Sequence, residues 1–239
     1  LPEDIPIESK MVTKAIERAQ TTVEQKNAEV RKNILKYDEV MNEQRKVIYR
    51  RRDEIISGAS LRGSVVEALE MAVGESVGTF CGADHPEEWD LEGLKAEING
   101  YWPSTLGVDE LAQVSSSDEV WDLITNEGLK AYESRETVLG VDILREVERQ
   151  VMLRIIDQRW REHLYEMDHL REGIHLRAMG QRNPTTEWQR EGYALFEELT
   201  DLLHRDFLRY VMRVQVTSEE KASEPADFVT SGPEGPVEG

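Results

Sequence analysis

Residues 7–57 contain neither glycine nor proline, and this unbroken stretch constrains the fold more than any other feature of the chain. Apolar residues recur along it mainly at steps of three and four, which places them on one face of an α-helix. Ser57-Gly58 can end the helix. About 50 residues make a rod of roughly 75 Å, and we expect its apolar stripe to pack on partner helices. The stripe comprises Ile7, Met11, Ala15, Ile16, Ala19, Val23, Val30, Ile34, Tyr37, Met41, Ile48 and Ile55.

A second long pattern predicts a helical hairpin. Residues 142–172 again lack glycine and proline, and a further apolar stripe follows from Trp188 to Val214. Thr186 and Gln189 have the spacing of a capping box, so we expect the second helix to begin there. Two helices of similar length around a short break form an αα-hairpin. Its tip is expected at about residues 173–184, and residues 142–217 form the hairpin with the rest of the helical framework.

The segment between these elements differs in composition. Residues 58–141 contain ten glycines and carry 4 basic and 17 acidic side chains, a net charge of −13. Helical patterns persist near 61–77, 90–99 and 118–134, and Trp89, Trp102 and Trp121 can anchor a small core. We expect a small helical subdomain inserted between the long helix at 1–57 and the hairpin. The predicted fold class is therefore all-α.

Charge and cysteine content exclude several classes of protein. The net charge of −19 argues against a general nucleic-acid or lipid-surface binder. One cysteine, Cys81, allows no intrachain disulfide. No signal peptide or membrane-spanning run is apparent. Residues 218–239 are acidic and rich in proline and glycine, so we expect disorder there. The first residue is Leu, which leads us to expect a piece of a longer protein.

The motifs of a self-sufficient enzyme are missing. A phosphate-binding loop requires a Gly-Lys-Ser/Thr sequence, and none of the sixteen glycines is followed by lysine. His163, His169 and His175 are six residues apart and cannot share a helix face, so we expect solvated or capping histidines and no zinc site. Cys81 near His85 is interpreted as a loop thiol. The basic cluster Arg45–Arg52 either binds an acidic partner or, as the simpler interpretation, keeps the end of the helix solvated, where cations also suit the helix dipole.

The hairpin tip is the most unusual segment. Residues 173–184 read GIHLRAMGQRNP, so three large apolar residues, Ile174, Leu176 and Met179, fall where the helices break. They either pack back on the hairpin or form an adaptable contact surface, for which methionine is well suited. The residues alone favour neither interpretation.

Two separated stretches resemble the SecA family of bacterial preprotein translocases. Residues 23–48 read VEQKNAEVRKNILKYDEVMNEQRKVI, followed by Tyr49, and resemble the long helix of the helical scaffold. Residues 149–184 read RQVMLRIIDQRWREHLYEMDHLREGIHLRAMGQRNP and resemble the two-helix finger. The acidic middle is similar to the helical wing domain, less specifically. The resemblance extends over about residues 2–217.

The resemblance implies a role in ATP-driven transport of unfolded preproteins through the SecYEG channel. In the family the long helix contacts the nucleotide-binding domains, which would hold ATP and Mg, and the finger touches channel and substrate and restrains the ATPase. A homodimer is possible, and the location would be the bacterial cytoplasm and the cytoplasmic face of the plasma membrane. Met179 matches the substrate-contacting tip residue, and the other residues expected around it are Ile174, Leu176, Arg177 and Gln181.

The chain also departs from the family pattern. The motor domains are absent, so no catalytic or cofactor-binding residue is assigned, and the cysteine-rich zinc tail is absent, so zinc is not supported. Ala28 stands where the family often has Phe. Two alternatives stay open: a free-standing helical adaptor, motivated by the missing phosphate loop, and a nucleic-acid-binding helical module, motivated by Arg45–Arg52 and made improbable by the charge.

Overall fold

The computed structural model describes residues 10–174, 176 and 183–215. These residues form helices and connecting loops and contain no β-strand, which confirms the all-α prediction. None of the described helices is long and apolar enough to cross a membrane. The α-helices are α1 (Lys10–Ile56), α2 (Arg62–Phe80), α3 (Leu91–Tyr101), α4 (Val108–Leu111), α5 (Ser117–Leu139), α6 (Val141–Gly173) and α7 (Pro184–Arg213), with a 3-10 turn at Pro86–Glu88.

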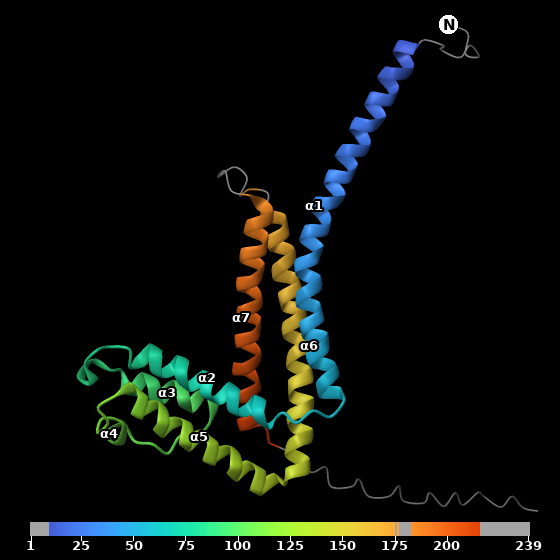
Figure 1. Ribbon diagram of the computed structural model, residues 1–239. Helices are drawn as coiled ribbons and strands as arrows, with labels where there is room; N and C mark the ends of the chain where they lie inside the picture. The colour runs from blue at the N-terminus through green and yellow to red at the C-terminus, as the bar shows by residue number, and fades with distance from the viewer. Residues whose placement is uncertain (1–9, 175, 177–182, 216–239) are drawn as a thin grey trace, which may run out of the picture.

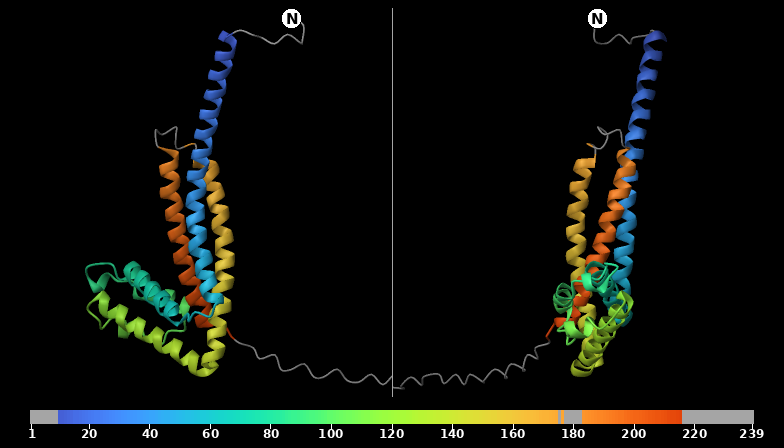
Figure 2. Two further views of the ribbon diagram at one scale, coloured as in Figure 1. Left: turned by 45° about the vertical axis from the view of Figure 1, so that its right-hand side comes forward. Right: turned by 90° about the vertical axis from the view of Figure 1, so that its left-hand side faces the viewer.

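The long helix is continuous, but only its second half is packed. α1 runs for 47 residues and ends at Ile56, and Gly58 with φ of 90° follows as the sequence predicted. Its first half extends past the other helices in both views of Figure 2. The exposed fraction is 54% for Ile16, 56% for Val23 and 49% for Val30, whereas Ile48 and Ile55 are buried. Among the described residues, the apolar stripe of α1 packs against other helices only from Tyr37 onward.

α6 and α7 form the expected hairpin, and the second half of α1 lies along it as a third helix (Figure 1). Toward the tip, Met167 of α6 and Trp188 of α7 are buried and pack with Tyr37 and Val40 of α1. Nearer the base, Trp160, Ile156, Leu203 and other apolar residues continue the core between the three helices. Hydrophobic burial along this seam holds α1 to the hairpin.

The inserted segment forms a small group of helices, α2 to α5, which packs on the lower half of α7 (Figure 1). Phe207, Leu208 and Val211 of α7 are fully buried in the same cluster as Val65 and Leu69 of α2. Trp102 is buried as expected of an anchor, and Trp89 and Trp121 are partly buried against the core. One apolar core thus runs from this small group of helices into the hairpin.

A charged cluster joins the inserted helices to α6. Glu148 of α6 is fully buried, and Tyr132 of α5 donates a hydrogen bond of 2.5 Å to its Oε1. Arg145 donates to Glu148 and, over 2.5 Å, to Glu136 of α5. Burial and the hydrogen bond to Glu148 raise the pKa of Tyr132. A cation and a hydroxyl pair with Oε1 of this buried carboxylate and offset part of its desolvation cost, whereas Oε2 has no hydrogen-bond partner among the described residues.

Gly128 lies in close contact with two apolar core side chains of the inserted helices, and Gly128→Ala is expected to destabilise the chain. An added Cβ would lie 2.7 Å from Leu69 Cδ1 and 2.9 Å from the rigid ring of Trp102. Overpacking of this kind costs about 1–3 kcal/mol. Urea unfolding followed by circular dichroism measures the loss. Gly78→Ala is the matched control, because nothing lies within 4 Å of its added Cβ and helix propensity favours alanine. Equal stabilities for the two variants would contradict the expectation.

Candidate functional site

The residues that the sequence analysis proposed as substrate contacts all lie at the hairpin tip. The structure describes two of the five: Ile174 directly after α6, and Leu176. Ile174 is fully buried and packs with Met167 and Trp188, whereas the exposed fraction of Leu176 is 62%. Packing back on the hairpin therefore describes Ile174, and Leu176 is available for contact. Arg177, Met179 and Gln181 lie outside the described residues.

The start of α7 corrects one expectation. The helix begins at Pro184 with Asn183 as its N-cap, three residues before Thr186, the N-cap of the predicted capping box. Asn183 Oδ1 accepts hydrogen bonds from the backbone N–H groups of Thr185 (2.9 Å) and Thr186 (3.4 Å). Asparagine is among the strongest N-cap residues and proline suits the first helical position, so this pair outcompetes the threonine. The cap fixes the end of the tip segment.

A second group of residues, not expected from the sequence, joins the three long helices about two turns below the tip. Gln44 of α1 is 6% exposed and His163 of α6 is 2% exposed. Gln44 Nε2 donates to the carbonyl of Gly192 in α7 over 2.8 Å, and His163 Nε2 lies 2.9 Å from Gln44 Oε1. One amide side chain thus bonds to both helices of the hairpin.

The environment of His163 keeps its ring neutral. The ring stacks on Trp160 with centroids 5.4 Å apart and meets Phe196 edge-on at 5.8 Å. Burial lowers the pKa of His163 to about 4. Because the amide nitrogen of Gln44 faces the Gly192 carbonyl, its oxygen faces the ring, so His163 Nε2 carries the proton and donates. The expectation of a solvated or capping histidine was wrong for His163, because it lies between Trp160 and Met167 on the buried face.

The remaining histidines and acidic side chains form no metal centre in the described part of the chain. His169 has an exposed side chain, and His175 lies outside the described residues. No group of three or more His, Cys, Asp or Glu side chains that could hold a metal ion occurs among the described residues. Cys81 is buried, and burial raises the pKa of its thiol, which opposes the thiolate form.

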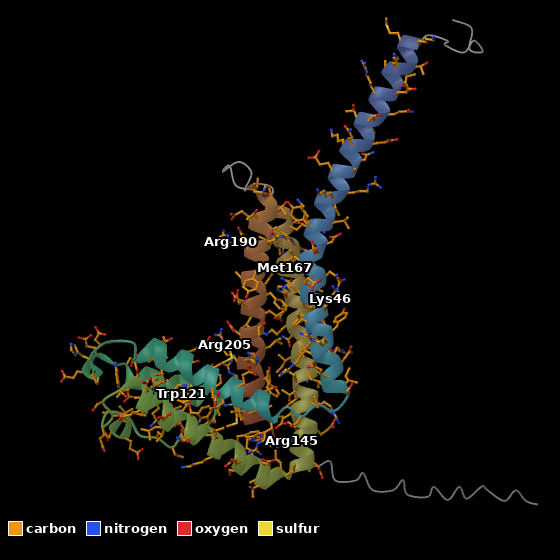
Figure 3. The ribbon with its side chains drawn as sticks, viewed as in Figure 1. Lys46, Trp121, Arg145, Met167, Arg190 and Arg205 are labelled. Carbon is orange, nitrogen blue, oxygen red and sulfur yellow. The ribbon has the colours of Figure 1, made fainter. Side chains whose placement is uncertain are left out.

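The geometry defines a class of helical module: a long helix, of which one half is exposed, held on a hairpin that shares its core with a small side group of helices. Figure 3 shows Met167 near the tip end of the hairpin and Arg145 near its base, with Trp121 in the side group. A family model described as the SecA wing and scaffold domain matches residues 6–215. The chain therefore belongs to the SecA family.

Individual relatives agree with this assignment. Protein translocase subunit SecA 1 of Thermobifida fusca is 44% identical over 223 residues, which cover 90% of this chain and 23% of the relative. Protein translocase subunit SecA of Streptomyces griseus is 40% identical over 230 residues, covering 94% of this chain and 24% of the relative. The SecA of Pelotomaculum thermopropionicum is 42% identical over 224 residues, or 92% and 25%. The chain spans about a quarter of the length of these relatives.

The low pKa of His163 generates a pH prediction. Its pKa is about 4 in the folded state and near 6.5 when the chain is unfolded. The unfolded state binds more protons between these values, so stability is lost as the pH falls from about 6.5 towards 4. The shift corresponds to about 3 kcal/mol when the fall is complete. Urea unfolding at pH 7, 5.5 and 4.5 measures it.

His163→Phe is the reference variant for this titration. It keeps a ring against Trp160 and Phe196 but cannot take up a proton, so its stability should fall less over the same pH range. The lowered pKa of His204, which is also due mainly to burial, affects both proteins equally. If parent and variant lose stability in parallel, His163 does not have the assigned pKa.

Proposed function

We propose that this chain is the wing and scaffold part of a translocase that uses ATP to move unfolded preproteins through the SecYEG channel. The match of the SecA wing and scaffold model to residues 6–215 carries the proposal. In this proposal the chain transmits movement through its long helix and contacts the substrate and the channel through its hairpin. ATP and Mg would be bound by nucleotide-binding domains outside this sequence, since no phosphate-binding loop is present in it. The proposed location is the bacterial cytoplasm, with peripheral association at the cytoplasmic face of the plasma membrane.

The long helix is proposed as the lever of this machine. Its first half presents an apolar row, Ile16, Val23, Val30 and Ile34, of which each member is 44–56% exposed. A helix of this length rarely keeps such a row without a partner, and we assign the nucleotide-binding domains to that place. Its second half is buried on the hairpin. A movement of the first half would therefore be carried into the hairpin through a packed seam.

The hairpin is proposed as the finger that delivers this movement to the substrate and the channel. Leu176 at 62% exposure supports a contact role for the tip. Ile174 anchors the tip by packing with Met167 and Trp188, and a direct contact for it stays a prediction. Met179 is the proposed substrate contact, with Arg177 and Gln181 beside it. Restraint of the ATPase by this region and assembly into a homodimer belong to the same proposal.

A free-standing helical adaptor is the alternative, motivated by the missing phosphate-binding loop. The intact mass of the native protein, captured from cell extract with an antibody to this chain, separates the two. The chain alone has a mass of 27.5 kDa. The translocase proposal expects a mass several-fold larger, since the relatives are about four times as long. A native mass near that of the chain alone would favour the adaptor.

Met179→Gly tests the finger in the complete translocase subunit. Loss of the contacting side chain should slow preprotein translocation into membrane vesicles much more than it slows ATP hydrolysis, because the motor domains are untouched. Both rates are measured on the same vesicles. Val138→Gly is the control, since Val138 is 79% exposed at the end of α5, next to the base of α6 and far from the tip. An unchanged translocation rate for Met179→Gly would contradict the assignment of Met179 as a substrate contact.

A further inference from the structure

The seam between α1 and the hairpin repeats every seven residues. Met41, Ile48 and Ile55 form one row and are partly or fully buried. Tyr37, Gln44 and Arg51 form the other row. Residues seven apart lie on nearly the same face of a helix, so α1 could slide by one heptad, about 10 Å, and present similar side chains to the hairpin. Val30 and Ile34 are exposed one heptad above Tyr37 and Met41 and could enter the seam.

We call each axial position of α1 along the hairpin, one heptad from the next, a register. Two of the polar contacts across this seam could form equally well in neighbouring registers. Trp188 Nε1 donates to the backbone carbonyl of Tyr37 over 3.2 Å, and every residue of α1 offers such a carbonyl. Arg52 pairs with Asp157, but both side chains are well exposed and Arg45 stands seven residues earlier. An exposed ion pair contributes little to stability. Neither contact selects the observed position of α1.

Gln44 does distinguish the registers. Its amide donates to the Gly192 carbonyl and accepts from His163, and both partners are inside the core. A slide of one heptad would replace it by Tyr37 or Arg51. A guanidinium has no acceptor for the His163 N–H. A tyrosine ring is larger than the glutamine side chain and would enter a site where α1 and α7 are in van der Waals contact, since a Cβ added to Gly192 would lie 3.5 Å from Val40 Cγ1.

We infer that Gln44, His163 and the Gly192 carbonyl form a register lock that fixes the axial position of α1 on the hairpin. A single buried polar residue in a heptad seam is the best established device for this purpose, because every other register leaves a buried polar group unpaired. Gln44 is a positioning residue. The lock also sets how far the exposed half of α1 extends past the tip. Its role in carrying movement to the finger rests on the proposed function.

A distance measurement on the 239-residue chain tests the lock. Lys26→Cys and Glu198→Cys place spin labels on exposed positions of α1 and α7. Lys26 precedes Gln44 by 18 residues and Glu198 follows Gly192 by six, so the labels lie on opposite sides of the lock along the helix axis. A slide of one heptad would change their distance by nearly 10 Å. Cys81 is 3% exposed and should stay unlabelled, which is checked on the chain without added cysteines. The distances are read by pulsed electron spin resonance.

The parent should give one narrow distance, and Gln44→Met should add a second population displaced by several ångströms. His163→Phe should add the same population, because it removes the partner from the other side and keeps a ring against Trp160. Ile48→Val is the control: it weakens the same seam without touching the lock and should keep the single distance. If Gln44→Met and His163→Phe both keep the single distance of the control, the lock is overturned.

The test of the register lock can fail or succeed independently of the proposed translocase function. The label distance is read on the chain alone, so it stands or falls whatever the complete subunit transports. In the complete subunit, Gln44→Met should lower the amount of preprotein translocated per ATP hydrolysed relative to Ile48→Val. A second distance together with unchanged coupling would keep the lock and overturn its part in the lever.

Discussion

The burial of α7 is the interaction on which the rest of the structure depends. Its upper half packs against α6 and α1, and its lower half packs against α2, α3 and α5. Phe207, Leu208 and Val211 are fully buried, so the small group of helices is held on the hairpin by the same hydrophobic effect that holds the hairpin together. Removing α7 would leave three apolar surfaces exposed at once. The position of the small group of helices on the hairpin therefore depends chiefly on α7.

Two polar clusters enter this core, and each is held by hydrogen bonds between helices, although Glu148 Oε2 and His163 Nδ1 have no hydrogen-bond partner among the described residues. Glu148 is buried with Arg145 and Tyr132, and Gln44 is buried with His163 and the Gly192 carbonyl. Apolar packing is tolerant of sliding, since one leucine-sized side chain replaces another at little cost. Hydrogen bonds between buried groups have no such tolerance, because a lost partner leaves a desolvated atom unpaired. The first cluster fixes the wing on α6, and the second fixes the long helix on the hairpin.

The two ends of the scaffold differ in how much of their apolar surface is covered. Toward the base, α1 is buried to Ile55, while beyond the tip its stripe is exposed through Val23 and Ile16. At the tip, Ile174 is covered and Leu176 is not. These exposed apolar groups at the two ends are the observation on which the lever and finger proposed above rest. The buried groups form the packed seam that connects the two ends.

The sequence by itself determined the helices and their ends. The glycine-free runs, the steps of three and four, Gly58 after α1 and the break between α6 and α7 are local signals, and each predicts local structure. The SecA resemblance carried by residues 23–48 and 149–184 gave the family as well. These features need no knowledge of what lies across a helix. The N-cap of α7 was missed by three residues because Asn183, followed by Pro184, is a stronger cap than Thr186.

Only the tertiary structure decided which surfaces are buried. The stripe of α1 reads alike along its length, yet half of it is covered, because the hairpin is shorter than α1. Gln44 and His163 are 119 residues apart, and no local sequence pattern around either residue predicts that they form a buried hydrogen bond. The same holds for Ile174 and Leu176, two apolar residues in one break with opposite burial. Periodicity gives the face of a helix, whereas burial depends on a partner that the helix itself does not encode.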